Sequence, residues 1–364
     1  MKGALVRISR GQSAAVLAVG TAALLLSGCA GKAADAASSV AAGAKSAAAS
    51  AIAGAQSAAA SAAAGGASAA ASAVAAAAPC GKVNIAQNPW VGYEADVAVV
   101  NYVLTNKLGC DVKVTDVDEQ ISWQGFDTGQ TDVILENWGH PDLEKKYIDE
   151  KKVAVDVGSA GNNGVIGWYV PKWMSEKYPD ITDWNNLNKY ADMFKTSESG
   201  GKGQLLDGDP SFVTNDEALI KNLGLNYKVV YAGSEEALIK ALQQSTEKQT
   251  PLIMYFYEPQ WALAKYPMTK ISLPAWKEGC DADPKAVNCD YPPYPLNKIG
   301  RAEFMSGGSP AATMIKNFSW TNEDQNAVAE MITAQKMSDA DAAKKWVDAN
   351  PDKVAAWLQG TGAA

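Results

Sequence analysis

The sequence predicts an α/β fold of two lobes, each with a mostly parallel sheet flanked by helices. From Cys80 to the C-terminus, short β-like runs alternate with stretches of helical periodicity, which favours parallel strands covered by helices. This stretch is longer than one compact core usually holds, so we expect two lobes. We place the first lobe at residues 80–166 and 262–364 and the second at residues 167–261.

The first lobe is predicted to open with a strand, a helix, a strand, a helix and a strand. We expect the strands at 82–86, 111–117 and 131–135, and the helices at 94–108 and 121–129. Val97, Val100 and Leu104 give the first helix its apolar spacing. Ligands of such sheets bind beyond the carboxyl ends of the strands. Trp90 and Trp138 follow the first and third strands and therefore belong at that edge.

A strand at 164–170 is expected to cross into the second lobe, where the alternation resumes. We expect helices at 183–194, 217–223 and 235–244, the last with Leu238 and Leu242 facing inward, and strands at 203–206, 229–232 and 252–257. The tail from Pro310 is predicted to be helical, with helix caps at Thr321 and Ser338. Thr214 and Glu217 form a capping-box pattern that predicts the start of helix 217–223. The free amides of that start predict an anion site beside Phe212.

The N-terminal 79 residues predict export and a tether. An apolar run at 14–26 follows basic residues and is too short to span a bilayer, as in a signal peptide. It ends in Leu26-Ser27-Gly28-Cys29, which resembles a bacterial lipobox and implies cleavage before Cys29 and lipid attachment to its sulfur. The alternative is an ordinary signal peptide with an incidental cysteine. We expect a signal peptide at 1–28, an Ala/Ser-rich tether at 29–79, and anchoring on the outer face of the bacterial cytoplasmic membrane.

Composition argues against several classes of function. The formal net charge is −8 and basic clusters are absent, which argues against nucleic acid and against electrostatic membrane binding. His140 is the only histidine, so a site with several His ligands is excluded. No Gly-x-Ser-x-Gly elbow or Gly-rich phosphate motif occurs. We expect neither an enzyme nor a metal or other cofactor.

Four cysteines remain once Cys29 is assigned to lipid, and export predicts that they form two disulfides. Cys280 and Cys289 are close enough in sequence to close a small loop. Cys80 and Cys110 precede the first and second strands, and adjacent parallel strands would bring them together. Three pairings are formally possible, and the sequence excludes none of them.

Aromatic residues follow several predicted strands. Trp90, Trp138, Phe212 and Tyr257 share this placement, at a cleft between the lobes. Converging rings can cage a cation that donates no hydrogen bond, such as a quaternary ammonium. A single Trp at a strand end more often packs in the core, and we assign packing roles to Trp168, Trp173, Trp184, Trp276, Trp320, Trp346 and Trp357.

From Cys80 onward the sequence resembles the substrate-binding proteins of ABC importers for glycine betaine and related osmolytes. The matching stretches are NIAQNPW at 84–90, VILENW at 133–138, DPSF at 209–212 and IMYFYEPQW at 253–261. The resemblance implies a clamshell in which three or four rings box a trimethylammonium group. It also implies backbone amides, often with a His, that bind a carboxylate, and delivery of the ligand by a monomer to a permease driven by an ATPase.

The resemblance assigns roles to individual residues. Trp138 matches the first-lobe ring, Trp90 a ring used by some members, Tyr257 a ring that is often Trp, and Phe212 a position where one branch has Trp. The amides of Val213 and Thr214 fall where the carboxylate is held, and His140, which lies closer to its Trp than the family's usual His, is a candidate partner for that carboxylate.

We expect glycine betaine as the ligand, with choline or proline betaine as alternatives within the same class. Glu136 and Glu258 lie near the box and would favour a cation without a carboxylate, but we expect both to be solvated rim charges. An alternative from another class is a lipid-anchored glycoside hydrolase that uses these two acids as its carboxylate pair. A purely structural envelope protein would leave the aromatic residues unexplained. Hinges are expected at 165–168 and 257–261.

Overall fold

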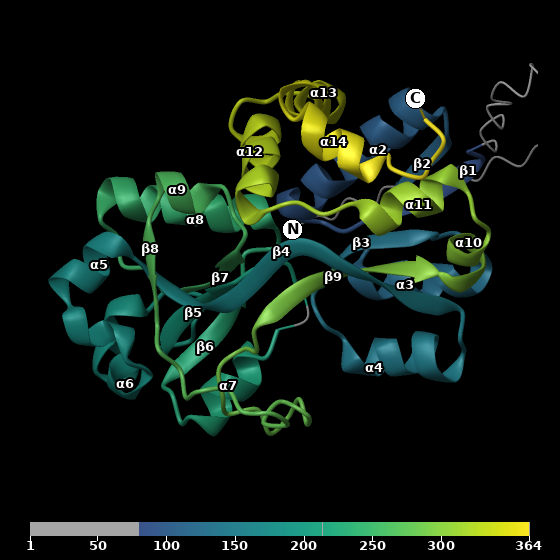
Figure 1. Cartoon of the computed structure of the whole chain (residues 1–364). Coiled ribbons are helices and arrows are strands. Elements are labelled where there is room, and N and C mark those ends of the chain that lie inside the picture. The colour runs from purple at the N-terminus through teal and green to yellow at the C-terminus, as the bar shows by residue number, and fades with distance from the viewer. Residues whose placement is uncertain (1–79, 213, 364) are drawn as a thin grey trace, which may run out of the picture. The chain divides into compact units, whose positions relative to one another are not determined.

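The computed structural model describes residues 80–212 and 214–363, whose helices flank a mixed sheet (Figure 1). The strands of this part are β1 (Lys82–Gln87), β2 (Asp111–Asp116), β3 (Val133–Asn137), β4 (Ala154–Pro171), β5 (Gly203–Asp207), β6 (Tyr227–Tyr231), β7 (Met254–Glu258), β8 (Met268–Lys270) and β9 (Tyr294–Arg301). The predicted signal peptide, the tether, Cys29 and Val213 lie outside the described residues.

The helices of the same part, with their shorter 3-10 and π turns labelled η, follow the chain in this order: α2 (Val91–Leu108), α3 (Glu119–Thr128), α4 (Pro141–Glu144), η1 (Lys145–Glu150), α5 (Lys172–Lys177), η2 (Pro179–Thr182), η3 (Trp184–Asn186), α6 (Leu187–Tyr190), η4 (Ala191–Phe194), α7 (Asp216–Asn222), α8 (Glu235–Lys248), α9 (Ala262–Lys265), α10 (Ala302–Ser306), α11 (Pro310–Asn317), α12 (Asn322–Thr333), α13 (Asp339–Ala349) and α14 (Pro351–Trp357). No helix within residues 80–212 and 214–363 has the length and apolar character needed to cross a membrane.

The sheet is parallel toward its two ends and antiparallel in its middle. Its strand order is β2-β1-β3-β9-β4-β7-β5-β6, with β8 paired to β4. β1 pairs in parallel with β2 and β3, and β5 pairs in parallel with β6 and β7. β9 and β4 run antiparallel to their neighbours. The two parallel sets are those predicted from the β-α-β order, and the antiparallel centre arises because β9 inserts between β3 and β4.

Strand β4 is the element shared by the two halves of the sheet. Its residues 154–164 pair with β9, whereas its residues 165–169 pair with β7, and Figure 1 shows it running the length of the sheet between them. Only residues 164–170 were predicted as strand. The earlier part is rich in Gly, Asn and Ser, and it is held extended by a partner far along the chain rather than by its own β propensity.

The segment that follows β7 stays with the second parallel set. β8 pairs with β4 near Tyr169, the side-chain amide of Asn222 donates to the carbonyl of Val287 at 2.8 Å, and Tyr291 Oη donates to Asp216 at 2.6 Å. We therefore propose that the chain returns to the first lobe at β9 rather than at residue 262.

Two local predictions were wrong and two were right. Residues 183–194, predicted as one helix, form the short turns η3, α6 and η4 instead. The capping box at Thr214 is absent, because α7 has Asn215 at its N-cap and Thr214 Oγ1 donates to Asp207 at 2.9 Å. The predicted caps of the tail are confirmed, since Thr321 caps α12 in a complete capping box and Ser338 caps α13.

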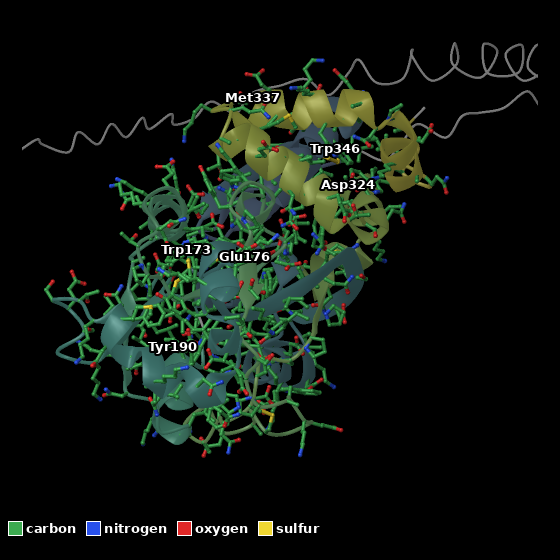
Figure 2. All side chains as sticks on the ribbon, turned by 90° about the vertical axis from the view of Figure 1, so that its left-hand side faces the viewer. Trp173, Glu176, Tyr190, Asp324, Met337 and Trp346 are labelled. Carbon is green, nitrogen blue, oxygen red and sulfur yellow. A yellow bond between two sulfur atoms is a disulfide. The ribbon has the colours of Figure 1, made fainter. Side chains whose placement is uncertain are left out.

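Apolar side chains fill the space between the sheet and the helices. Leu238 and Leu242 of α8 are fully buried, as their spacing predicted. In the C-terminal helices, Trp346 stacks on Trp357 with ring centroids 5.5 Å apart and contacts Trp320 edge-on at 5.4 Å. Figure 2 shows Trp346 among these helices, well separated from Tyr190 of α6.

Two disulfides tie the described residues together. One joins Cys80 to Cys110 at the starts of β1 and β2, and the other joins Cys280 to Cys289 within the segment between β8 and β9. Both bonds limit the freedom of the unfolded chain and so favour the folded state.

Candidate functional site

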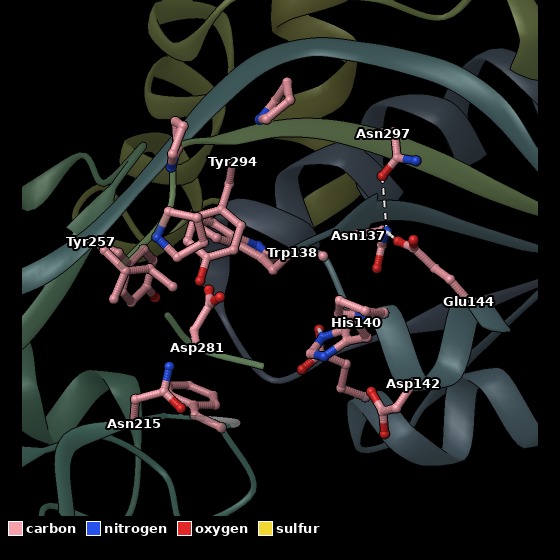
Figure 3. Close-up of a pocket in the computed structure, with 18 of the residues that line it drawn as sticks. Asn137, Trp138, His140, Asp142, Glu144, Asn215, Tyr257, Asp281, Tyr294 and Asn297 are labelled. Atoms are coloured by element: carbon pink, nitrogen blue, oxygen red, sulfur yellow. Dashed lines mark hydrogen bonds and ion pairs between the residues drawn. The ribbon is translucent and has the colours of Figure 1, made fainter. Parts of the chain in front are cut away.

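A cavity of about 1040 Å³ lies beyond the carboxyl ends of β1, β3 and β5, where the sequence placed the site. Trp90 follows β1, Trp138 and His140 follow β3, and Phe212 follows β5. The segment between β8 and β9, together with residues of α4, β4, β7 and β9, contributes most of the remaining wall. Figure 3 shows Trp138, Tyr257 and Tyr294 gathered together in this cavity, with Asn215, Asp281 and His140 around them.

Six aromatic rings form a continuous chain of contacts along the cavity. In spatial order they are Trp90, Phe212, Tyr255, Tyr257, Trp138 and Tyr294, with successive centroids 5.8, 6.5, 6.0, 5.8 and 5.6 Å apart. The first and fourth contacts are edge-on, at 86° and 78°. We call these six side chains the aromatic cage. Their differing orientations present several ring faces to one space.

The structure brings most of the predicted site residues to one place. Trp90, Trp138, His140, Phe212 and Tyr257 all line the cavity. Thr214 does not line it, and the hydroxyl of that side chain is engaged with Asp207. Its neighbour Asn215 lines the cavity instead. The ligand-binding role of these residues stays a prediction, now with a shared cavity to support it.

Three lining aromatic residues were not selected from the sequence. Tyr255 precedes Tyr257 by two residues on β7, so strand alternation puts both rings on one face, a signal that was present. Tyr294 begins β9, and Trp276 lies in the segment between β8 and β9, before the disulfide-closed loop, and neither residue follows a strand that the sequence predicted. Trp276 had been assigned to packing. It is partly exposed, and its indole donates to Asp281 at 3.0 Å.

Trp138 rests directly on the backbone of a glycine. A Cβ atom added at Gly164 would lie 2.4 Å from Trp138 Cζ3, closer than real Cβ contacts come. Gly208 stands in the same relation to Phe212, at 2.7 Å from Cδ2. Glycine at these two positions lets each ring pack directly against the main chain. The positions of the two rings are therefore set by backbone atoms rather than by flexible side chains.

Glu136 was expected at a solvated rim, and the structure contradicts this. It is 1% exposed and does not line the cavity. Its Oε1 accepts the indole N–H of Trp90 at 2.9 Å and that of Trp138 at 2.7 Å. Two buried indoles need an acceptor, and one carboxylate serves both. Glu258 is exposed at the end of β7 and borders a different hollow, so the two acids do not face each other as a hydrolase pair would.

Glu235 holds another ring of the aromatic cage and joins distant parts of the chain. Its Oε1 accepts the hydroxyl of Tyr257 and the side-chain amide of Gln260, the latter at 2.6 Å. Its Oε2 accepts the backbone N–H of Val91, the first residue of α2, at 2.8 Å. Burial raises the pKa of Glu235 from its ordinary value of 4.5 to about 7, although these hydrogen bonds lower it. The carboxylate therefore fastens a cage ring to the start of α2.

His140 lies against an acid of the cavity wall. Its Nε2 is 2.6 Å from Glu119 Oε1, and both residues line the cavity. Burial lowers the pKa of His140, but the carboxylates of Glu119, Asp142 and Glu144 together raise it, and the net direction is upward. This ion pair already satisfies the charge of the imidazolium. It is thus a weaker partner for a ligand carboxylate than the sequence suggested.

The charged lining of the cavity is acidic. Five acids contribute to it, namely Glu119, Asp142, Glu144, Asp156 and Asp281, whereas no Lys or Arg does so among the described residues. Within residues 80–212 and 214–363, no group of three or more His, Cys, Asp or Glu side chains could hold a metal ion. An acidic, aromatic-lined cavity suits an organic cation.

Comparison with known proteins gives one family match and several relatives. The family described as the substrate binding domain of the ABC-type glycine betaine transport system matches residues 81–349. A curated relative, the trimethylamine N-oxide-binding protein of Pelagibacter ubique (strain HTCC1062), is 27% identical over 262 residues, which cover 67% of this chain and 80% of the relative.

Solved structures share the fold at lower identity. Lactococcal OpuAC, crystallised closed with glycine betaine, has a TM-score of 0.58 at 21% identity, covering 76% of this chain and 99% of its own. An ABC-transporter choline binding protein in complex with choline has a TM-score of 0.63 at 18% identity, covering 77% of this chain and 92% of its own. These likenesses concern the fold alone, and they confirm the predicted α/β architecture.

Proposed function

Because the chain belongs to the family of substrate-binding domains of ABC-type glycine betaine transport systems, we propose that it captures a small quaternary ammonium compound in the aromatic cage and delivers it to a membrane permease. Members of this family bind solutes for transport and are not enzymes. The buried, indole-bound position of Glu136 also disfavours the hydrolase alternative.

The observation that carries this proposal is the set of six rings that meet around one cavity. A tetraalkylated nitrogen carries a full charge but donates no hydrogen bond, so carboxylates and carbonyls can attract it but cannot hold it through directed hydrogen bonds. Ring faces attract it through their quadrupoles, at about 0.5–2 kcal/mol per face as water is excluded. Rings from separate strand ends supply several such faces at once.

Within this class the lining favours choline over glycine betaine. Glycine betaine carries a carboxylate that needs positive or N–H partners. Five acids line the cavity, Lys and Arg are missing from its described lining, and His140 is already paired with Glu119. Choline has a hydroxyl in place of the carboxylate and meets no such repulsion. Glycine betaine, the ligand expected from the sequence, becomes the second candidate.

A titration of the purified protein by calorimetry tests both levels of the proposal. We expect saturable one-to-one binding of choline, weaker binding of glycine betaine, and no binding of glucose as a neutral control. Glycine betaine that binds more tightly than choline would reverse the order within the class. If choline, glycine betaine and trimethylamine N-oxide all fail to bind, the class itself is wrong.

We further propose that two lobes close on the ligand about the paired strands β4 and β7. Val165 of β4 is opposite Glu258 of β7, so both predicted hinges lie side by side. The hydrogen bond from the Val91 N–H to Glu235 spans the two proposed lobes and would hold them together when the cleft is closed. In this proposal a ligand that binds the closed form better shifts the population toward it. Small-angle scattering with an unchanged radius of gyration on ligand addition would count against closure.

Attachment to the membrane is proposed through a lipid on Cys29, with residues 29–79 as a tether and the binding domain acting as a monomer outside the cytoplasm. The lipobox-like sequence and the Ala/Ser-rich composition support it. The intact mass of the mature protein tests whether Cys29 carries a lipid. A diacylglyceryl group on an N-terminal Cys29 adds a defined mass, whereas cleavage of an ordinary signal peptide adds none.

A further inference from the structure

A single buried carboxylate lies behind two rings of the aromatic cage. Glu136 Oε1 accepts the indole N–H groups of both Trp90 and Trp138. These tryptophans are 48 positions apart in the sequence and follow different strands, so the shared acceptor fixes the angle between their rings. Glu136 does not line the cavity, and any effect that it has on a ligand must pass through these indoles or through its charge.

The other partners of Glu136 are also uncharged donors. Its Oε2 accepts the side-chain amide of Gln325 at 2.5 Å, and the same amide nitrogen lies 3.3 Å from Asp96 Oδ2. Asp96 is fully buried; burial raises its pKa well above the usual range, and the charge of Glu136 raises it further. The Glu136 carboxylate accepts three N–H groups, from Trp90, Trp138 and Gln325.

The buried basic side chain of Lys298 forms no ion pair with Glu136. Lys298 is buried, and its ammonium donates to the carbonyls of Lys316 and Phe318 at the end of α11. No ion pair of the described residues involves Glu136. The charge of this carboxylate is not offset by an ion pair, and the low dielectric of the interior lets such a charge act over a distance of several ångströms.

Both effects of this carboxylate favour a cation between the rings. An indole that donates its N–H to an anion becomes richer in electron density, which strengthens the attraction of its face for positive charge. The charge itself attracts a cation through a short path of protein rather than water. A neutral molecule of the same shape gains from neither effect.

We propose that Glu136 is a positioning residue that sets the ring geometry of the cage and makes it select a charged, methylated nitrogen over a neutral group of equal shape. This inference rests on the proposed function and names the physical basis of its selectivity. Trp90 and Trp138 contact the ligand, and Glu136 acts through them.

The test compares choline with 3,3-dimethyl-1-butanol, its neutral carbon isostere, by calorimetry and competition. Glu136→Gln keeps an oxygen that can accept the indoles but removes the charge. We expect choline to bind at least about tenfold more weakly to this variant, whereas the affinity for the isostere changes by less than about threefold. Glu258→Gln removes one exposed charge at the end of β7 and is the matched control, with both affinities unchanged.

An equal loss for both ligands would mean that Glu136 serves structure alone, and an unchanged choline affinity would mean that its charge is irrelevant. Either result overturns the proposal.

A measurement without ligand separates the role of Glu136 in ring positioning from the proposed function. We expect the indole N–H resonances of Trp90 and Trp138, assigned with single Trp→Phe variants, to shift in Glu136→Gln and not in Glu258→Gln. Shifted resonances in a protein that binds no quaternary ammonium would refute the proposed function and the selectivity while leaving the ring positioning intact; unshifted resonances would refute the positioning itself.

Discussion

Replacing Trp138 with alanine is expected to weaken quaternary ammonium binding by about 2 kcal/mol or more, which corresponds to a roughly thirtyfold higher Kd. Trp138 contacts two other rings of the cage, Tyr257 and Tyr294. Its removal deletes one ring face, releases two neighbours, and leaves an acceptor on Glu136 without one of its donors. Calorimetric titration of choline into the wild type and the variant measures the loss.

Two further variants show whether the loss belongs to the cage. Trp138→Phe keeps a ring but no N–H donor, so we expect an intermediate loss. Trp173→Ala removes a partly buried tryptophan on α5 that does not line the cavity (Figure 2), and we expect no change in affinity. Folding of each variant is checked by its thermal transition. An unchanged affinity in a folded Trp138→Ala protein would rule out the cage.

Glu235 is expected to make stability depend on pH between about 4.5 and 7. Its pKa is raised to about 7 in the folded protein, so the folded state holds the proton more tightly than the unfolded chain. A raised pKa contributes stability that is complete below the unfolded value of 4.5 and is lost as pH rises through about 7. The contribution is on the order of 3 kcal/mol.

Urea unfolding of the wild type and of Glu235→Gln at several pH values measures this contribution, because the other titrating groups are present in both proteins. We expect the free energy of unfolding of the wild type to fall, relative to the variant, as pH rises from 4.5 to 7.5. Glu236→Gln removes an exposed acid from the neighbouring position of α8 and is expected to follow the wild type closely. A difference between wild type and Glu235→Gln that does not vary with pH would contradict the buried-carboxylate account.

The parallel parts of the sheet could be predicted from the sequence because each strand and helix in them has a local sequence pattern. β1 to β3 and β5 to β7 are short runs of apolar or alternating residues separated by helical periodicity, and each was placed within a few residues. β9 was not predicted. It contains Pro, Asn and Lys, and it is a strand because β3 and β4 supply hydrogen-bond partners on both sides. Pairing between distant segments cannot be derived from propensity.

The cage residues were predicted to the extent that they follow strands. Trp90, Trp138, Phe212 and Tyr257 stand where a strand ends, and the carboxyl edge of a parallel sheet gathers such positions. Tyr294 reaches the cavity from a segment whose course depends on a disulfide and on contacts with α7 and β4, so no local pattern marks it.

The largest error concerned Glu136, and it shows where sequence reasoning fails. A carboxylate beside a strand end is usually solvated, and for this reason Glu136 was expected at the solvated rim of the cavity. The indoles of Trp90 and Trp138 reverse it, because two buried N–H groups from different strands require an acceptor at the point where they converge. The position of that point depends on how β1 and β3 pair in the sheet, so neither the sequence around Trp90 nor the sequence around Trp138 predicts it alone.

Titration of tetramethylammonium, the smallest ligand that carries only the group the cage should hold, is the most direct test of this account. We expect saturable binding with one site per chain in the wild type and its loss in Trp138→Ala. Tetramethylammonium that fails to bind the wild type, or that binds Trp138→Ala equally well, would show that the rings do not hold a methylated cation.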